Sequence, residues 1–137
     1  MNLPADDQLK KILQEVRVIA VVGLSPKPDR ASYRVAHYLQ SVGYQIIPIR
    51  PMATEILGAP CYASLTDIPP QFHVDLVCVF RQEEFTPPIA QEAVQIGAKI
   101  LWLQLGISNE SAMQIARQAG LTAIQDACLM VEHRRVM

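Results

Sequence analysis

Short apolar runs alternate with amphipathic stretches along the whole chain. Runs of mostly β-branched residues such as 18–22 (Val-Ile-Ala-Val-Val) are typical of strands buried on both faces of a sheet. Stretches such as residues 32–42, with Val35, Leu39 and Val42 on one side, predict helices that cover a sheet. This alternation predicts a parallel α/β sheet with right-handed crossovers.

Glycine and proline residues set the bounds of the predicted elements. We predict strands at residues 18–22, 44–49, 60–63, 74–80, 99–103 and 121–124, the one at 60–63 being a short edge strand. We predict helices at residues 6–16, 32–42, 87–96 and 109–119, with a further short one within 126–135. Together they predict a single domain over residues 1–137. Its Rossmann-like, doubly wound, mainly parallel sheet has five or six strands in the order 3-2-1-4-5-6, with helices on both faces.

The composition is that of a globular domain. With 50% hydrophobic and 18% charged residues, a chain of 137 residues buries a core without help from disulfides. A formal net charge of −1 does not favour nucleic acid as a partner, and no apolar run is long enough to predict a membrane span. The three cysteines, Cys61, Cys78 and Cys128, have no CxxC spacing, so neither a disulfide framework nor a zinc motif is predicted. This cysteine usage favours a location in the reducing cytoplasm. The identity of any protein partner stays open.

The loop at residues 23–32 follows the first buried strand, where a Rossmann domain binds phosphate on free amides and a helix dipole. Gly23 permits a tight turn, and the hydroxyls of Ser25 and Ser32 can donate to an anion. Ser32 is also expected to cap the helix, while Lys27 and Arg30 add positive charge. The G-x-G-x-x-G pattern is incomplete, so a rigid turn that binds nothing stays an alternative.

Arg50 ends the second predicted strand. NAD-dependent enzymes place Asp or Glu there, about 20 residues beyond the glycines, to hold the ribose 2′-hydroxyl. An arginine instead attracts a phosphate and can bind it bidentately. Arg50 therefore favours a cofactor with a phosphorylated ribose, NADP or coenzyme A (CoA), the alternative being a solvated residue at a strand end.

No catalytic residue and no metal site is predicted. Ser25 lacks the second glycine of G-x-S-x-G, and no two histidines have metal-ligand spacing. Cys78 is expected to be an inert core thiol. Cys128 stands before a possible helix start, which makes it a candidate for a mixed disulfide with the CoA thiol. An NADP-binding oxidoreductase or redox-sensing module stays the alternative function, although no Tyr-x-x-x-Lys pair is present.

Several segments in order resemble the small stand-alone CoA-binding proteins, which are similar to the amino-terminal domain of the succinyl-CoA synthetase alpha subunit. The longest is residues 22–30 (Val-Gly-Leu-Ser-Pro-Lys-Pro-Asp-Arg). The others are residues 32–35 (Ser-Tyr-Arg-Val), 47–51 (Ile-Pro-Ile-Arg-Pro), 56–58 (Ile-Leu-Gly), 79–81 (Val-Phe-Arg), 97–99 (Gly-Ala-Lys), 102–107 (Trp-Leu-Gln-Leu-Gly-Ile) and 132–135 (Glu-His-Arg-Arg). They cover nearly the whole chain, and their combination is specific where each alone is weak.

This resemblance implies a domain that binds CoA or an acyl-CoA. It implies that residues 23–32 take the pyrophosphate, and that Arg50 and Pro51 lie by the adenosine, with Arg50 meeting its 3′-phosphate. It places Val79, Phe80 and Arg81 beside the adenine or the pantetheine, and Gln104 and Gly106 on the far side. The family commonly has Asn at the place of Arg50. The synthetase carries its phosphorylated histidine on a second domain, so the resemblance implies binding without ligase chemistry.

Overall fold

A computed structural model of the protein describes residues 3–137. Helices and strands alternate along the chain as the hydrophobic pattern predicts. The helices are α1 (Asp6–Glu15), α2 (Ala31–Ser41), α3 (Thr86–Gln95), α4 (Glu110–Gln118) and α5 (Leu129–Val136), with short 3-10 turns η1 (Leu65–Asp67) and η2 (Glu83–Phe85). The strands are β1 (Val18–Val22), β2 (Gln45–Ile49), β3 (Glu55–Ile56), β4 (Ala59–Pro60), β5 (Leu76–Val79), β6 (Ile100–Leu103) and β7 (Thr122–Ile124).

Five of these strands form one parallel sheet in the order β2-β1-β5-β6-β7. The order confirms the Rossmann-like prediction. The chain runs from β1 outward to β2 and then returns to the other side of β1 at β5. The carboxyl ends of β1 and β5 are therefore next to each other at the switch point, where open α/β sheets bind ligands.

The predicted edge strand at residues 60–63 is reduced to a single parallel bridge. Tyr62 pairs with Ile49, its amide donating to the oxygen of Pro48 and its oxygen accepting from the amide of Arg50. The preceding residues instead form a separate antiparallel pair, β3 with β4, which uses the backbone of Pro60. The position beside β2 is thus as predicted, while the strand itself is too short to count in the sheet.

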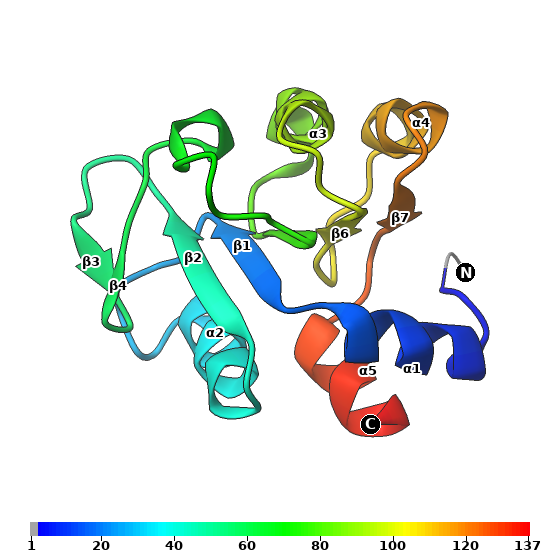
Figure 1. The fold of residues 1–137 in the computed structure, drawn as a ribbon, viewed down its shortest axis with the longest axis horizontal. Helices are drawn as coiled ribbons and strands as arrows, with labels where there is room; N and C mark the ends of the chain where they lie inside the picture. Colours follow the sequence, from blue (N-terminus) through cyan, green and yellow to red (C-terminus); the bar gives the residue numbers. More distant parts are fainter. Residues whose placement is uncertain (1–2) are drawn as a thin grey trace.

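Alternate side chains of each strand pack into two separate cores, one on each face of the sheet. One core joins the sheet to α1, α2 and α5 through residues such as Leu13, Leu39 and Leu129. The other joins it to α3, α4 and η1, with Ile89 and Met113 among its members. Figure 1 shows these two helix layers below and above the sheet. Within residues 3–137, no helix combines the length and the apolar character needed to cross a membrane.

His133 joins α5 to α2 in the first of these cores. It is only 8% exposed, and its Nδ1 lies 2.6 Å from the hydroxyl of Tyr38. The rings of Tyr38 and Tyr44 both meet the imidazole edge to face. Burial lowers the pKa of His133, because a charged imidazolium loses hydration in this aromatic surrounding.

This burial predicts a loss of stability in mild acid. The unfolded chain takes up the proton near pH 6.5, whereas the folded protein takes it up only at lower pH. The free energy of unfolding should therefore have its full value above pH 6.5 and should decrease as the pH drops below 6.5. Urea unfolding at pH 7.5 and pH 5.5 measures the decline. His133→Gln should reduce it, while His37→Gln, at an exposed position of α2, should leave it unchanged. An equal decline in wild type and His133→Gln would contradict this assignment.

Candidate functional site

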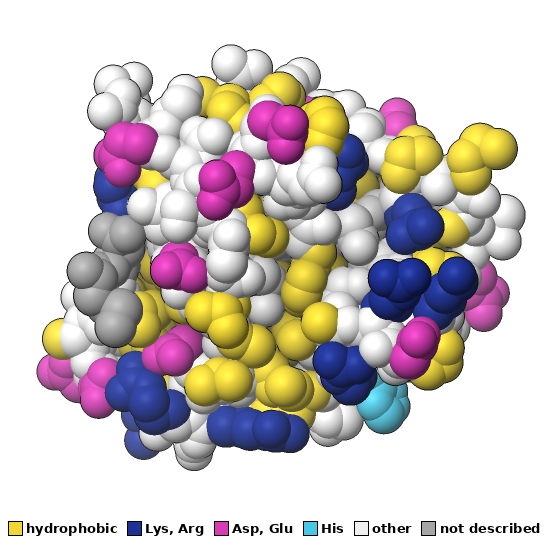
Figure 2. All heavy atoms as spheres, turned by 180° about the vertical axis from the view of Figure 1, so that it is seen from behind, with side chains coloured by type: hydrophobic (Ala, Val, Ile, Leu, Met, Phe, Trp, Pro, Cys, Tyr) yellow, Lys and Arg dark blue, Asp and Glu magenta, His cyan; other side chains and the backbone are white. Residues whose placement is uncertain are grey.

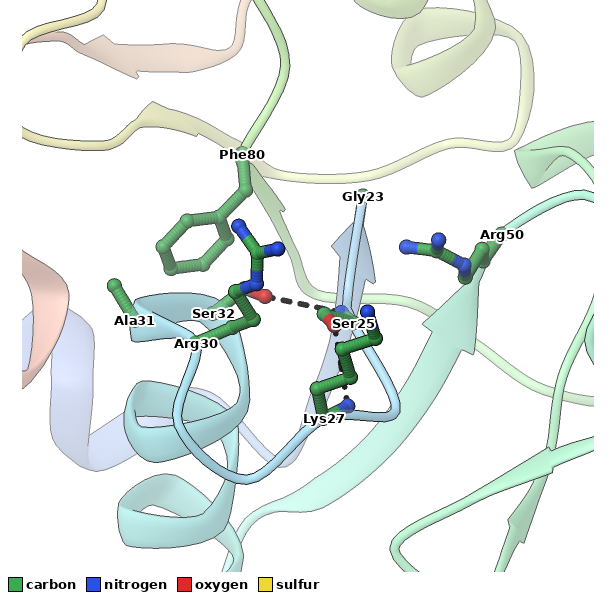
Figure 3. A pocket seen from close by; sticks show the side chains of 8 residues that line it. All are labelled: Gly23, Ser25, Lys27, Arg30, Ala31, Ser32, Arg50 and Phe80. Carbon is green, nitrogen blue, oxygen red and sulfur yellow. Dashed lines mark hydrogen bonds between the residues drawn. The ribbon is translucent and has the colours of Figure 1, made fainter.

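Two neighbouring cavities open at the carboxyl end of the sheet. The first has a volume of about 420 Å³ and lies between the β1–α2 loop, the end of β2 and the end of β5. It is shown in Figure 3 and is lined by Gly23, Ser25, Lys27, Arg30, Ala31, Ser32, Arg50 and Phe80. The second has a volume of about 510 Å³ and is lined by Phe80, Arg81, Gln82, Glu83, Glu84, Gly106 and Ile107. Phe80 lines both, so the two cavities adjoin at this residue.

Gly23 sets the entry of the chain into the first cavity. Its φ is +84°, a left-handed conformation that favours glycine, and its amide donates to the oxygen of Ile49 on β2. A Cβ built at this position would lie 2.5 Å from the backbone oxygen of Phe80, closer than atoms of a real side chain come. The turn therefore needs glycine for its backbone angle and also for its close approach to β5.

Hydrogen bonds within the β1–α2 loop fix its shape. The amide of Ser25 donates to Oγ of Ser32 at 3.0 Å, and the amide of Lys27 donates to Oγ of Ser25 at 3.1 Å. The prediction that Ser32 caps the helix is wrong, because α2 begins one residue earlier, at Ala31. Its cap residue, Arg30, makes no hydrogen bond with its side chain. Ser32 instead braces the loop, and its hydroxyl hydrogen stays available to a ligand.

The backbone donors of the cavity come from the helix rather than from the loop. The amides of Gly23, Ser25, Lys27 and Arg30 are all used within the protein. The amides at the start of an α-helix have no partner within it. Ala31 and Ser32 supply such amides to the cavity wall, at the positive end of the α2 dipole.

Three cationic side chains surround these donors. Arg50 points from the end of β2 toward the loop, and Arg30 stands across the cavity from it, with Lys27 on the loop between them (Figure 3). The ion pairs found within residues 3–137 involve Arg135 and leave these three cations unpaired. No lining residue of this cavity is acidic. Figure 2 shows Lys and Arg side chains gathered over the side of the molecule where α2 and β2 lie.

The second cavity has a wall fixed by hydrogen bonds. The carboxylate of Glu83 accepts from the amide of Ser108 at 3.2 Å, and the Glu83 backbone oxygen accepts from the Asn109 amide group at 2.9 Å. The amide of Gly106 donates to the carboxylate of Asp126 at 2.8 Å. The guanidinium of Arg81 lies 4.7 Å from the centre of the Phe85 ring. The Glu83 contacts tie the β6–α4 loop to η2, just before α3, and the Asp126 contact ties the same loop to the β7–α5 loop.

The structure brings most of the predicted site residues together. Seven line the first cavity: Gly23, Ser25, Lys27, Arg30, Ser32, Arg50 and Phe80. Arg81 and Gly106 line the second, again with Phe80. The cavities are also lined by residues that were not predicted as site residues: Ala31, Gln82, Glu83, Glu84 and Ile107. The signal for Ala31 was its place at the first turn of a helix.

Three predicted residues lie outside both linings. Val79 has no exposed surface and packs within the sheet core. Gln104 is only 4% exposed, and its side-chain oxygen accepts from the amide of Leu129 at 2.9 Å, so it holds the start of α5. Pro51 is exposed beside Arg50. Val79 and Gln104 were predicted to line the cavity, but the side chain of Val79 packs in the core and that of Gln104 bonds to the backbone of α5.

The cysteines lie away from the cavity walls. Burial raises the pKa of the Cys78 thiol, which agrees with an inert core position. Cys128 precedes α5 and is partly exposed, but it is not among the residues lining either cavity. Within residues 3–137, no group of three or more His, Cys, Asp or Glu side chains is arranged to hold a metal ion.

The fold and the comparison with known proteins agree on the class of molecule. The parallel sheet with a β1–α2 loop at its switch point defines a Rossmann-like α/β protein. Residues 17–134 match the model of the CoA binding domain family. The chain belongs to this family.

Relatives extend over the whole chain. The protein YneT of Bacillus subtilis (strain 168) is 41% identical over 133 residues, which is 97% of each chain. The structure of a hypothetical protein from Pyrococcus horikoshii OT3 matches with a TM-score of 0.94 at 35% identity, covering 99% of this chain and 94% of that one. Acetate–CoA ligase (ADP-forming) I of Archaeoglobus fulgidus is 24% identical over 82% of this chain, which spans only 18% of the ligase.

The close approach at Gly23 predicts a large effect of one methyl group. Gly23→Ala should destabilise the protein in two ways, through its positive φ and through the clash with the Phe80 oxygen. Gly120→Ala is the matched control, since Gly120 has a φ of +89° and a Cβ placed on it would meet nothing within 4 Å. We expect both to lose about 1–2 kcal/mol from the left-handed backbone, and Gly23→Ala to lose about 1–3 kcal/mol more from overpacking. Equal losses in urea unfolding would contradict the close approach.

Proposed function

We propose that the protein binds CoA or an acyl-CoA, with the phosphates of the ligand in the first cavity. The observation that carries this proposal is the acid-free cavity at the start of α2, where unpaired amides, two serine hydroxyls and three cations converge. Such a site suits pyrophosphate, because helix amides and fixed positive charges act on the same anion. Membership of the CoA binding domain family supports the choice of cofactor.

Arg50 is the residue we assign to the ribose phosphate. It stands at the carboxyl end of β2, on the opposite side of the cavity from the α2 amides. In a Rossmann-type site this strand end meets the ribose of the nucleotide. A guanidinium there favours the 3′-phosphate of CoA, and it would equally favour the 2′-phosphate of NADP. Binding measurements must therefore separate these two cofactors.

The pantetheine arm would then leave the pyrophosphate in the direction of β5 and β6. With Arg50 on the β2 side and the pyrophosphate at the β1–α2 loop, the remaining open volume is the second cavity. Phe80 stands between the two volumes and would pack against the arm. We propose that this arrangement binds the cofactor without catalysis of its own. Neither His nor Cys is among the described residues that line the two cavities, which leaves the serines there without an imidazole base.

Isothermal titration calorimetry with CoA, acetyl-CoA, NADP and NAD tests the choice of cofactor. We expect binding of CoA and acetyl-CoA in the micromolar range or tighter. NADP binding at micromolar concentration, with no binding of either CoA species, would reject the proposal in favour of an NADP-dependent protein.

Arg50→Gln should weaken CoA binding at least about tenfold, because a charge-assisted contact to phosphate contributes roughly 1.5–3 kcal/mol when well formed. Binding of 3′-dephospho-CoA should be weaker in the wild type and unchanged by the substitution. Arg134→Gln removes the same charge from exposed α5 and serves as the control. If Arg50→Gln weakens CoA and 3′-dephospho-CoA equally, Arg50 does not meet the 3′-phosphate.

Ser25→Asp tests the position of the pyrophosphate. A carboxylate at this loop position would repel the ligand phosphates and should weaken CoA binding at least about tenfold, as like charges brought together in a binding site do. Ser111→Asp adds the same charge to the exposed first turn of α4 and should leave CoA binding intact. Thermal unfolding of both variants checks that the fold is kept. Unchanged affinity in a folded Ser25→Asp protein would place the phosphates elsewhere.

A further inference from the structure

Among the helices that begin at the carboxyl edge of the sheet, α2 and α3 have surroundings of opposite charge. The first turn of α2 has no acidic residue, and Lys27 and Arg30 stand just before it. Glu83 and Glu84 stand directly before α3, in η2, and both line the second cavity. The amino end of α3 would attract anions by its dipole, but these two carboxylates offset that attraction.

The charge of Glu83 is held in place. Its carboxylate accepts from the amide of Ser108, and its backbone oxygen accepts from the Asn109 side chain and from the Thr86 hydroxyl. Two of these contacts fix the backbone of Glu83, and the hydrogen bond from Ser108 holds its carboxylate against the β6–α4 loop. The second cavity therefore has a carboxylate at its wall.

Arg81 does not reverse this balance. Its guanidinium lies over the Phe85 ring, and its Cδ lies 3.2 Å from the Cβ position built on Gly23. Its stem thus packs against the turn that leads into the first cavity. The second cavity contains one cation and two carboxylates, a net charge of −1 by this count, whereas the first contains three cations and no carboxylate.

From this separation of charge we infer that the site selects acyl-CoA ligands by the charge of the acyl group, accepting free CoA and uncharged short acyl-CoA and disfavouring acyl groups that end in a carboxylate. The inference rests on the proposed function, because it takes the thioester end of the ligand to lie in the second cavity. Glu83 is the specificity-determining residue. It acts through charge repulsion on a carboxylate brought within a few ångströms in a partly hydrated site.

The test compares acyl groups of similar length and different charge. Calorimetry is performed with CoA, acetyl-CoA, pentanoyl-CoA and succinyl-CoA. The first three carry no charge at the thiol or acyl end, and they should bind with similar dissociation constants. Succinyl-CoA should bind about three- to tenfold more weakly, the range expected for one repulsive contact between partly exposed charges. The difference should shrink at high salt, since such charges are screened.

Glu83→Gln is the informative variant, because its side-chain oxygen can still accept from the Ser108 amide while the negative charge is gone. It should bring the dissociation constant of succinyl-CoA to within about twofold of that of pentanoyl-CoA. The dissociation constants of CoA and of the acyl-CoA ligands with uncharged acyl groups should change little. Glu92→Gln is matched to it, since Glu92 also accepts from a backbone amide, that of Leu65, but does not line the cavity. This control should keep the discrimination of the wild type.

The outcomes distinguish a failure of the proposed function from a failure of the selectivity. If CoA itself does not bind, the proposed function fails and the selectivity fails with it. If CoA binds and succinyl-CoA binds as tightly as pentanoyl-CoA, the proposed function stands and the charge selection is overturned. If pentanoyl-CoA is excluded together with succinyl-CoA, or if Glu83→Gln keeps the discrimination, then size or another residue decides, and the role of Glu83 is overturned.

Discussion

The close packing of Gly23 between two strands is the constraint on which the site depends. Its amide bonds to Ile49 at the end of β2, while its Cα faces the Phe80 oxygen at the end of β5. The amide of Phe80 in turn donates to the oxygen of Val22, so three adjacent strand ends are held together. Because no side chain separates them, the loop leaves the sheet with Arg50 on one side and Phe80 on the other. The position of both cavities follows from this contact.

A loop with a single glycine at its start would present its donors to a phosphate differently from a G-x-G-x-x-G loop. In the glycine-rich form the backbone approaches the anion closely. Here prolines and serine hydroxyls account for four positions of the loop: Pro26 and Pro28 have no amide to donate, and the amides of Ser25 and Lys27 bond to hydroxyls. The loop becomes a rigid support that aims the start of α2 and its cations at one volume. A rigid support of this kind lowers the ordering cost when a ligand binds.

The fold was predictable from the sequence because it follows from local pattern. Buried β-branched runs and helices ended by glycine recur in an order that allows few topologies, and the two cores confirm the alternation of faces. The structure of residues 60–63 was harder to predict. Pro60 pairs with Glu55 instead of extending the edge of β2, so only Tyr62 pairs with β2. Gln104 shows the limit for the site: the resemblance implies that it lines the ligand, yet its oxygen accepts from a backbone amide 25 residues away, which no local signal indicates. The Ser32 hydroxyl was misassigned for a related reason, since its partner is seven residues back in a loop whose path depends on the contact at Gly23.

The net charge of the chain does not reveal how its charges are distributed around the two cavities. The chain as a whole carries −1, which taken alone argues against a preference for anions. Its three cavity cations, however, stand at a helix start where unpaired amides add to their field, while Glu83 and Glu84 stand just before α3. In the proposed binding mode, a ligand with phosphates at one end and a neutral arm at the other would satisfy both fields in only one orientation across the switch point. The fields that would attract the phosphates to α2 would then also direct the reactive end of the ligand toward α3, without any contact to the thiol itself.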